Sequence, residues 1–148
     1  RGSVTNGFVS GFGYQGEMAI ASTVAHDSHH MIVVGTCAEH MALAANRLAE
    51  VGGGVSVWKD GRELALVALP IAGLMSDAPA EEVAAKAAAM VQAMADCGCH
   101  LNNAYMQHSL LALVVIPDLR ISDLGLVDVR KFEIVPVVQG GSKEDASA

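Results

Sequence analysis

The chain has 148 residues, a formal net charge of −7 and a hydrophobic content of 52%. This length suits one domain and allows a sizeable core. The acidic balance and the lack of any Lys/Arg cluster argue against nucleic-acid binding, and no apolar run approaches the roughly 20 residues of a membrane span. The first seven residues lack the features of a signal peptide, so we expect a cytoplasmic protein without membrane or nucleic-acid partners.

The opening sixteen residues contain five glycines, a density typical of turns. We therefore expect a connector over residues 1–16. Two segments that follow, Glu17–Val24 and Met31–Val34, have the composition of short strands. The link between them, Ala25–His30, is rich in histidine and is called the histidine-rich turn below.

The next elements carry strong local signals. Apolar residues recur at helical spacing over Ala38–Val51, and the glycine triplet at 52–54 ends that helix. Asp60-Gly61 separates Val55–Lys59 from Arg62–Leu69. This dipeptide favours a type I′ turn, so the two segments are predicted to form a hairpin.

Pro79 suits the start of a helix, and the apolar stripe that follows predicts a helix to about Asp96. Two later apolar runs, Leu110–Ile116 and Val129–Val138, are strand candidates, although Pro136 requires an edge or a bulge. The polar residues from Gln139 onward predict a flexible tail over 139–148.

Together, these segments predict an α+β fold with about six strands and two main helices. Because the links after Val24 and Lys59 are too short for a crossover, the sheet is predicted to be largely antiparallel, with the helices packed on it. The predicted domain covers residues 17–138.

The histidine-rich turn concentrates the chemistry of the chain. His26, His29 and His30 are candidate metal ligands, and imidazole also moves protons near neutral pH. Asp27 and Ser28 add a carboxylate and a hydroxyl. A Ser-His-Asp hydrolase is a poor fit because no glycine-flanked elbow surrounds Ser28, whereas turn capping by these polar side chains stays open.

Other groups have plainer interpretations. The three cysteines are odd in number and are expected to be free thiols. Cys97-Gly98-Cys99-His100 lacks the second ligand pair of a zinc ribbon, so a helix end capped by Gly98 is favoured. His40 and His108 are expected to be surface or structural residues.

One further segment is unusual. Leu69–Asp77, called the apolar loop below, joins the hairpin to the second predicted helix and is mostly hydrophobic. It is expected either to be buried on its own sheet or to pack against another domain and line a cleft.

Four ordered segments resemble the C-terminal domain of the bacterial adenine deaminases, in the amidohydrolase superfamily. They are Gly7–Gly13 (GFVSGFG), Ala25–His30 (AHDSHH), Leu69–Asp77 (LPIAGLMSD) and Pro117–Val129 (PDLRISDLGLVDV). The resemblance runs from Gly7 to about Val138.

This resemblance implies a metal-dependent hydrolase of purine metabolism that deaminates adenine to hypoxanthine and ammonia. The divalent metal, manganese or iron, would lie in a preceding (β/α)₈ barrel domain. This chain has no H-x-H motif and is too short for a barrel of about 250 residues. We therefore expect adenine and the barrel domain as partners, a homo-oligomer being left open, and no activity from the 148 residues alone.

The resemblance carries supporting catalytic roles onto His26, Asp27, Ser28 and His29, which would contact substrate or orient groups that do. The family run commonly reads His-Asp-Ser-His-Asn, whereas position 30 here is histidine, so a role that needs an amide does not transfer to His30. The alternative function is a non-catalytic module that binds metal, supports the barrel or mediates oligomerisation.

Overall fold

The computed structural model describes residues 3–138, which form seven strands and three helices. Contacts within the chain define two compact units, one over Val9–Leu113 and one that combines the described residues 3–8 and 114–138. The predicted limits of the connector, 1–16, and of the domain, 17–138, stay predictions. The predicted tail, 139–148, lies outside the described residues.

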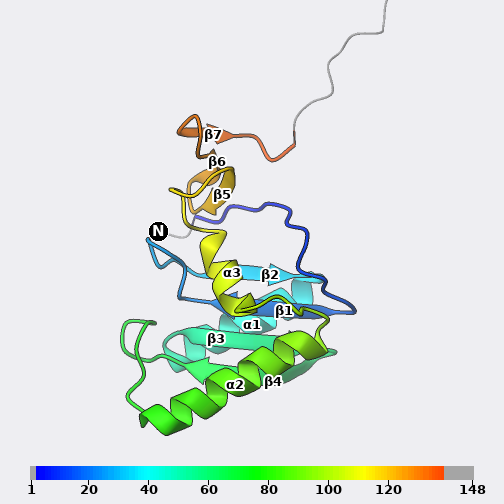
Figure 1. Ribbon diagram of the computed structural model, residues 1–148, viewed down its shortest axis with the longest axis vertical. Coiled ribbons are helices and arrows are strands. Elements are labelled where there is room, and N and C mark those ends of the chain that lie inside the picture. Colours follow the sequence, from blue (N-terminus) through cyan, green and yellow to red (C-terminus); the bar gives the residue numbers. More distant parts are fainter. Residues whose placement is uncertain (1–2, 139–148) are drawn as a thin grey trace, which may run out of the picture. The chain divides into compact units, whose positions relative to one another are not determined.

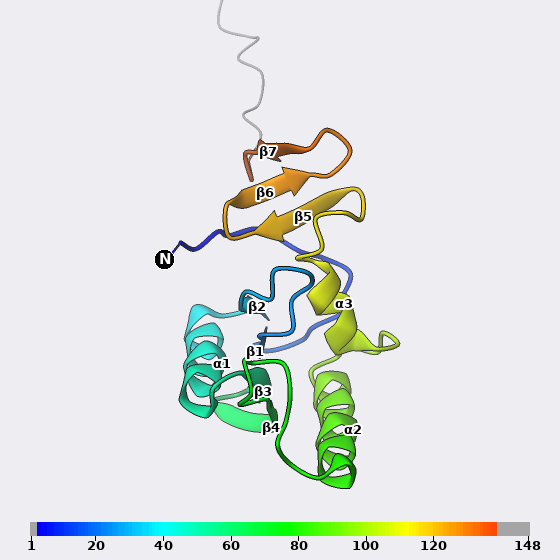
Figure 2. The same ribbon diagram turned by 90° about the vertical axis from the view of Figure 1, so that its left-hand side faces the viewer.

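The larger unit is built on a four-stranded sheet in the order β2-β1-β3-β4, with every neighbouring pair antiparallel. One helix, α1, covers one face, and α2 covers the other (Figures 1 and 2). The elements in chain order are β1 (Met18–Ser22), β2 (Ile32–Gly35), α1 (Ala38–Val51), β3 (Gly54–Lys59), β4 (Arg62–Ala68), α2 (Ala80–Asp96) and α3 (Ala104–Leu110). The predicted α+β class and antiparallel pairing are confirmed.

Strand β1 lies between two neighbours and under helices on both faces, so all five of its residues are buried. Its side chains alternate. Met18 and Ile20 enter the core that includes Met90 and Met94 of α2, whereas Ala19 and Ala21 meet α1. Methyl side chains on the α1 face leave room for close approach of the helix backbone.

The predicted hairpin is confirmed. Asp60 and Gly61 have φ angles of 49° and 75°, as a type I′ turn requires at both central positions. They join β3 to β4, whose register begins with Lys59 opposite Arg62.

Both predicted helices are confirmed at their ends. Helix α1 spans the predicted residues, and its C-cap Gly52 adopts the left-handed conformation with its N–H bonded to the Leu48 carbonyl. Helix α2 begins at Ala80, directly after Pro79, and carries Glu81 and Glu82 in its first turn, where carboxylates stabilise the helix dipole.

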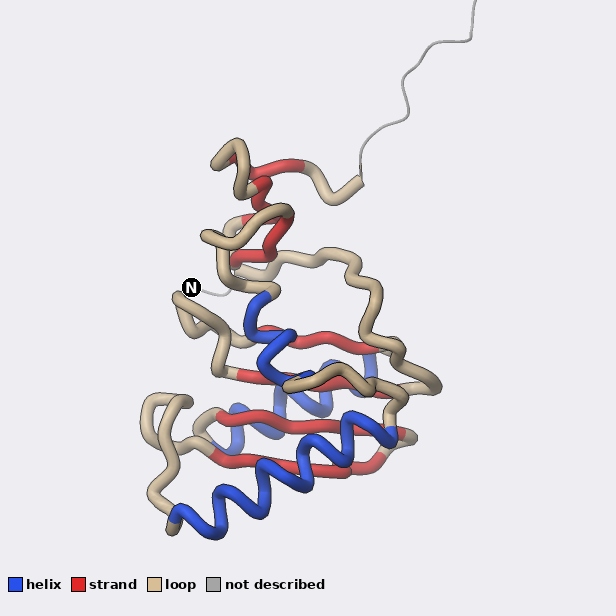
Figure 3. The backbone as a smooth tube through the Cα atoms, viewed as in Figure 1, coloured by secondary structure: helices blue, strands red, loops and turns tan. Residues whose placement is uncertain are grey.

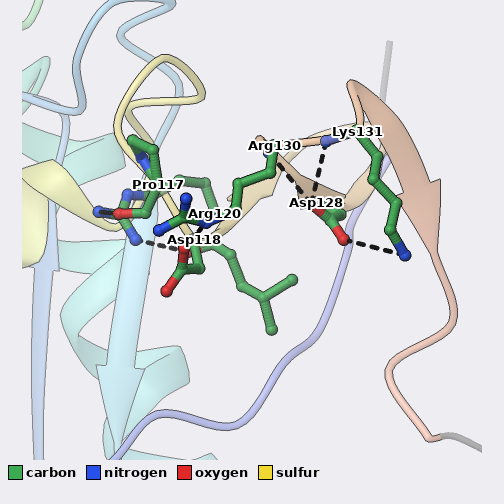
Figure 4. A network of polar contacts seen from close by, with 7 residues as sticks. Pro117, Asp118, Arg120, Asp128, Arg130 and Lys131 are labelled. Atoms are coloured by element: carbon green, nitrogen blue, oxygen red, sulfur yellow. Dashed lines mark hydrogen bonds and ion pairs between the residues drawn. The ribbon is translucent and has the colours of Figure 1, made fainter.

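The smaller unit contains a second antiparallel sheet, in the order β5-β6-β7, over Leu119–Ser122, Gly125–Asp128 and Glu133–Val135. Figure 4 shows its polar network. Asp128 Oδ1 accepts the backbone N–H groups of Arg130 and Lys131 at 3.1 and 3.2 Å, and Arg130 pairs with Asp118. These polar residues of the Pro117–Val129 segment therefore shape the turns that connect the strands.

One strand prediction is wrong, and a second is wrong in extent. Leu110–Ile116 is not a strand, because α3 ends at Leu110 and turns follow. Leu111 and Ala112 are instead packed against Ala25 and Ile32. Of Val129–Val138, only Glu133–Val135 is a strand, and it is the edge strand of the second sheet. The third helix and the second sheet were not predicted.

The segment before β1 is tied to α3 through His108. The His108 ring stacks on Phe12 at a centroid distance of 4.3 Å, and its Nε2 lies 2.7 Å from the Tyr14 hydroxyl. Its Nδ1 must donate to the Ala104 carbonyl, 2.9 Å away, because a carbonyl only accepts. The neutral ring therefore accepts the Tyr14 proton at Nε2, and burial raises the pKa of Tyr14, which keeps that proton in place.

None of the helices formed by residues 3–138 combines the length and the apolar character needed to cross a membrane.

Burial of His108 makes stability depend on pH. Burial lowers the pKa of His108 from 6.5 to about 4, because the charged ring loses its hydration. The unfolded chain therefore takes up a proton between pH 6.5 and pH 4 that the folded chain excludes. We expect this residue to lower the free energy of unfolding by about 3 kcal/mol from pH 7 to pH 4.

Urea unfolding at several pH values checks this expectation. The His108→Gln variant should be less stable at pH 7 but should lose about 3 kcal/mol less than the wild-type protein on acidification. Parallel pH profiles for the two proteins would contradict it.

Candidate functional site

The histidine-rich turn connects β1 to β2 at one end of the four-stranded sheet. The N–H of His29 donates to the Ala25 carbonyl at 2.6 Å and closes the turn. Ala25 itself is fully buried and packs in one cluster with Ile32 and Ala112. Packing of Ala25 in the core therefore fixes the start of the turn.

The polar side chains of the turn are accessible to solvent to different extents. Asp27, Ser28 and His29 are exposed, and His26 and His30 are half-buried. The rings of His26 and His29 meet edge to face, with centroids 5.4 Å apart and an interplanar angle of 70°. The arrangement presents two neighbouring imidazoles, a carboxylate and a hydroxyl toward one end of the sheet, where they can exchange hydrogen bonds and protons with a ligand.

His30 differs from its neighbours. Its Nδ1 is buried and has no hydrogen-bond partner among the described residues. Within residues 3–138, the one group of three or more potential metal donors with all ligand atoms within 4.8 Å of one another lies elsewhere, at Glu17, Cys37 and His40. Metal binding by His26, His29 or His30 stays a prediction, as do the supporting roles of His26, Asp27, Ser28 and His29.

The apolar loop, residues 69–77, leaves β4 at the same end of the sheet. Antiparallel pairing dictates this, since β1 ends where β3 begins and β4 ends (Figure 3). Its backbone closes on itself through a mutual pair of hydrogen bonds between Ile71 and Met75, both 3.1 Å. The side chains of Ile71 and Met75 are nevertheless 45% and 57% exposed. These two hydrogen bonds thus close the loop on itself, while its apolar side chains remain exposed to solvent.

A threonine joins these two features. The hydroxyl of Thr23, directly after β1, donates to the Gly73 carbonyl of the apolar loop at 2.6 Å. Sequence reasoning did not single out Thr23, because its partner lies 50 residues away and nothing local marks the pair.

The group formed by Glu17, Cys37 and His40 is better suited to an internal hydrogen bond than to a metal. The backbone N–H of Gly61 donates to His40 Nε2 at 2.6 Å, so the neutral ring carries its proton on Nδ1. That proton faces Cys37 Sγ, which lies 2.6 Å from Nδ1. A metal on Nδ1 would move the proton to Nε2, against the Gly61 N–H. His40 is therefore structural.

The predicted helix end at Cys97-Gly98-Cys99 is confirmed. Gly98 is left-handed, and the N–H groups of Gly98 and Cys99 bond the carbonyls of Ala95 and Met94 at 2.8 and 2.9 Å. Cys97 and Cys99 are buried in the core. Burial raises the pKa of Cys97, which keeps this thiol protonated and unreactive.

Comparison with known proteins gives a consistent answer. The family model described as the adenine deaminase C-terminal domain matches residues 1–133. The adenine deaminases of Ruegeria pomeroyi and Roseobacter denitrificans are each 80% identical to this chain over 138 residues, which cover 93% of the chain and 23% of each relative. The adenine deaminase of Moorella thermoacetica is 51% identical over 140 residues, 95% of the chain and 23% of that protein. The chain thus spans less than a quarter of the length of these curated relatives.

The state of the three thiols provides a test of the Cys37 environment. Cys37 is half-buried, whereas Cys97 and Cys99 are 0% and 2% exposed. We expect one equivalent of thiol to react with Ellman's reagent in the native chain and two more only after unfolding. Because Gly61 fixes the His40 proton toward sulfur, equimolar Zn²⁺ should leave the rate of the first equivalent unchanged.

The Cys37→Ser variant is the control and should lose only the fast equivalent. Protection of the fast thiol by equimolar Zn²⁺ would instead show that Glu17, Cys37 and His40 bind metal.

Proposed function

Since the chain belongs to the adenine deaminase C-terminal domain family, we propose that it is the C-terminal part of an adenine deaminase, which hydrolyses adenine to hypoxanthine and ammonia. The observation that carries this proposal is the match itself. It covers 93% of the chain at 80% identity to a protein named adenine deaminase, of which it forms only 23%.

The remaining part of the enzyme would hold the catalytic metal. In this proposal, manganese or iron would be bound in a preceding amidohydrolase barrel and would activate water for the hydrolysis. We do not place that ion in this chain, because the sequence has no H-x-H pair and both ring nitrogens of His40 are engaged, by Gly61 and by Cys37. The barrel domain and adenine are the proposed partners, and the proposed location is the cytoplasm.

The histidine-rich turn would then contribute from outside the metal site. His29, Asp27 and Ser28 are exposed, and His26 lies edge-on to His29. Imidazole and carboxylate groups in this position can hydrogen-bond the polar edge of a purine, or orient a group that does. A hydroxyl at Ser28 can serve the same purpose as donor or acceptor.

A supporting role without catalysis is the second candidate. The exposed apolar side chains of Ile71 and Met75 favour it, because such groups on a backbone-anchored loop suit contact with another part of a protein. In that case the turn would be a structural connection, and the domain would stabilise the barrel or an oligomer.

Alanine substitution in the full-length enzyme separates the two candidates. We expect His26→Ala and His29→Ala each to lower kcat/KM for adenine by about 10- to 100-fold, the usual loss when an orienting group is removed. His100→Ala removes an exposed imidazole from a different loop and should leave kcat/KM within about twofold. Steady-state kinetics, with unfolding curves to confirm folding, provide the measurement. Wild-type kinetics in both turn variants would favour the supporting role.

The isolated chain should lack activity, because the groups that activate water would lie outside it. Incubation of the 148-residue chain with adenine and Mn²⁺ or Fe²⁺ should release no ammonia above the rate without protein. Turnover that increases with protein concentration would place a complete active site in this chain.

A further inference from the structure

Thr23 ties three segments together at the end of β1 where the histidine-rich turn begins. Its hydroxyl oxygen accepts the backbone N–H of Gly54 at 2.8 Å. Its hydroxyl proton is directed to the Gly73 carbonyl at 2.6 Å, with the Gly54 carbonyl farther away at 3.3 Å. A single side chain therefore connects the start of the turn, the start of β3 and the apolar loop.

The backbone around this hydroxyl is packed too closely for side chains. Gly53 has a φ of +117°, and a Cβ atom there would lie 2.5 Å from the Gly73 Cα atom. A Cβ atom on Gly73 would lie 3.1 Å from Thr23 Oγ1. The apolar loop thus rests directly on the glycine segment that follows α1, and the Thr23 hydroxyl fills the remaining polar position.

We propose that Thr23 is a positioning residue that fixes the apolar loop beside the histidine-rich turn, so that both form one wall of the adenine site. Ile71 and Met75 suit the apolar faces of a purine ring, and the imidazoles of His26 and His29 suit its polar edge. The inference rests on the proposed function and adds a residue and a loop to it.

The other end of β1 carries a matched control. Thr36 Oγ1 accepts the backbone N–H of Met18 at 2.9 Å and lies 2.7 Å from the Gly16 carbonyl and 3.3 Å from the Met18 carbonyl. Its hydroxyl therefore makes the same kinds of bond at nearly the same distances as that of Thr23. Thr36 is more exposed than Thr23 and lies beside β1 residue Met18 rather than beside the turn and the apolar loop. Replacing either threonine by valine therefore removes bonds of the same kind at opposite ends of one strand.

The experiment compares Thr23→Val, Thr23→Ser and Thr36→Val in the full-length enzyme. Hydrogen exchange at the amides of residues 71–75 measures how firmly the loop is held. Steady-state kinetics with adenine measure whether a loosely held loop changes KM or kcat. In Thr23→Val we expect exchange to accelerate about tenfold and KM to rise about tenfold with kcat changed less, since the loop binds substrate rather than performing chemistry.

The two comparison variants should behave differently from Thr23→Val. Thr23→Ser keeps the hydroxyl and should restore both slow exchange and a low KM. Thr36→Val should leave exchange at residues 71–75 and KM within about twofold of wild type.

Distinct results separate this inference from the function on which it rests. Absence of adenine deamination by the wild-type enzyme would refute the proposed function. An active enzyme in which Thr23→Val and Thr36→Val have the same exchange and the same KM would refute the positioning role alone. Faster exchange with an unchanged KM would also refute it, because loosening the loop would then not affect adenine binding.

Discussion

Burial of β1 on both faces is the constraint on which the larger unit depends. The strand pairs with β2 on one side and β3 on the other, and its exposed fraction does not exceed 3% at any residue. Met18 and Ile20 each gain roughly 2 kcal/mol from burial against the α2 side, while Ala19 and Ala21 set the spacing to α1. A shift of one residue would exchange these two faces and place methionine where only alanine fits.

The fixed register of β1 determines what can happen at its ends. The strand cannot slide, so Thr36 keeps its bond to Met18 at one end and Thr23 keeps its bonds to Gly54 and Gly73 at the other. The antiparallel order then brings the link after β1 and the link after β4 to one end of the sheet. The exposed polar and apolar side chains of these links therefore lie on connections that a rigid scaffold supports, which is where binding residues are commonly found in proteins.

Sequence patterns predicted those elements whose signals are local. Helix α1 was limited by Gly52, and the hairpin was specified by Asp60-Gly61, both through φ angles that the residues themselves favour. The location of the histidine-rich turn followed in the same way, since a polar run between two strand patterns must lie at the end of a sheet.

The errors occurred where local signals were ambiguous. A seven-residue apolar run such as Leu110–Ile116 fits a strand or a buried helix end equally well, and the packing of Leu111 and Ala112 decided the outcome. Strands β5 to β7 are only three or four residues long, too short to show a period. The partner of Thr23 is distant in sequence, so its role became visible only once the sheet was formed.

Four of the six histidines fall into two kinds by environment. His40 and His108 are buried, and a backbone group fixes the proton of each ring: an N–H at Nε2 of His40 and a carbonyl at Nδ1 of His108. Both rings are therefore bound to the backbone of their own fold. In the histidine-rich turn, by contrast, His29 is exposed and His26 is half-buried, and their rings meet edge to face. The buried imidazoles therefore stabilise the scaffold, whereas those of the turn remain accessible at one end of the sheet.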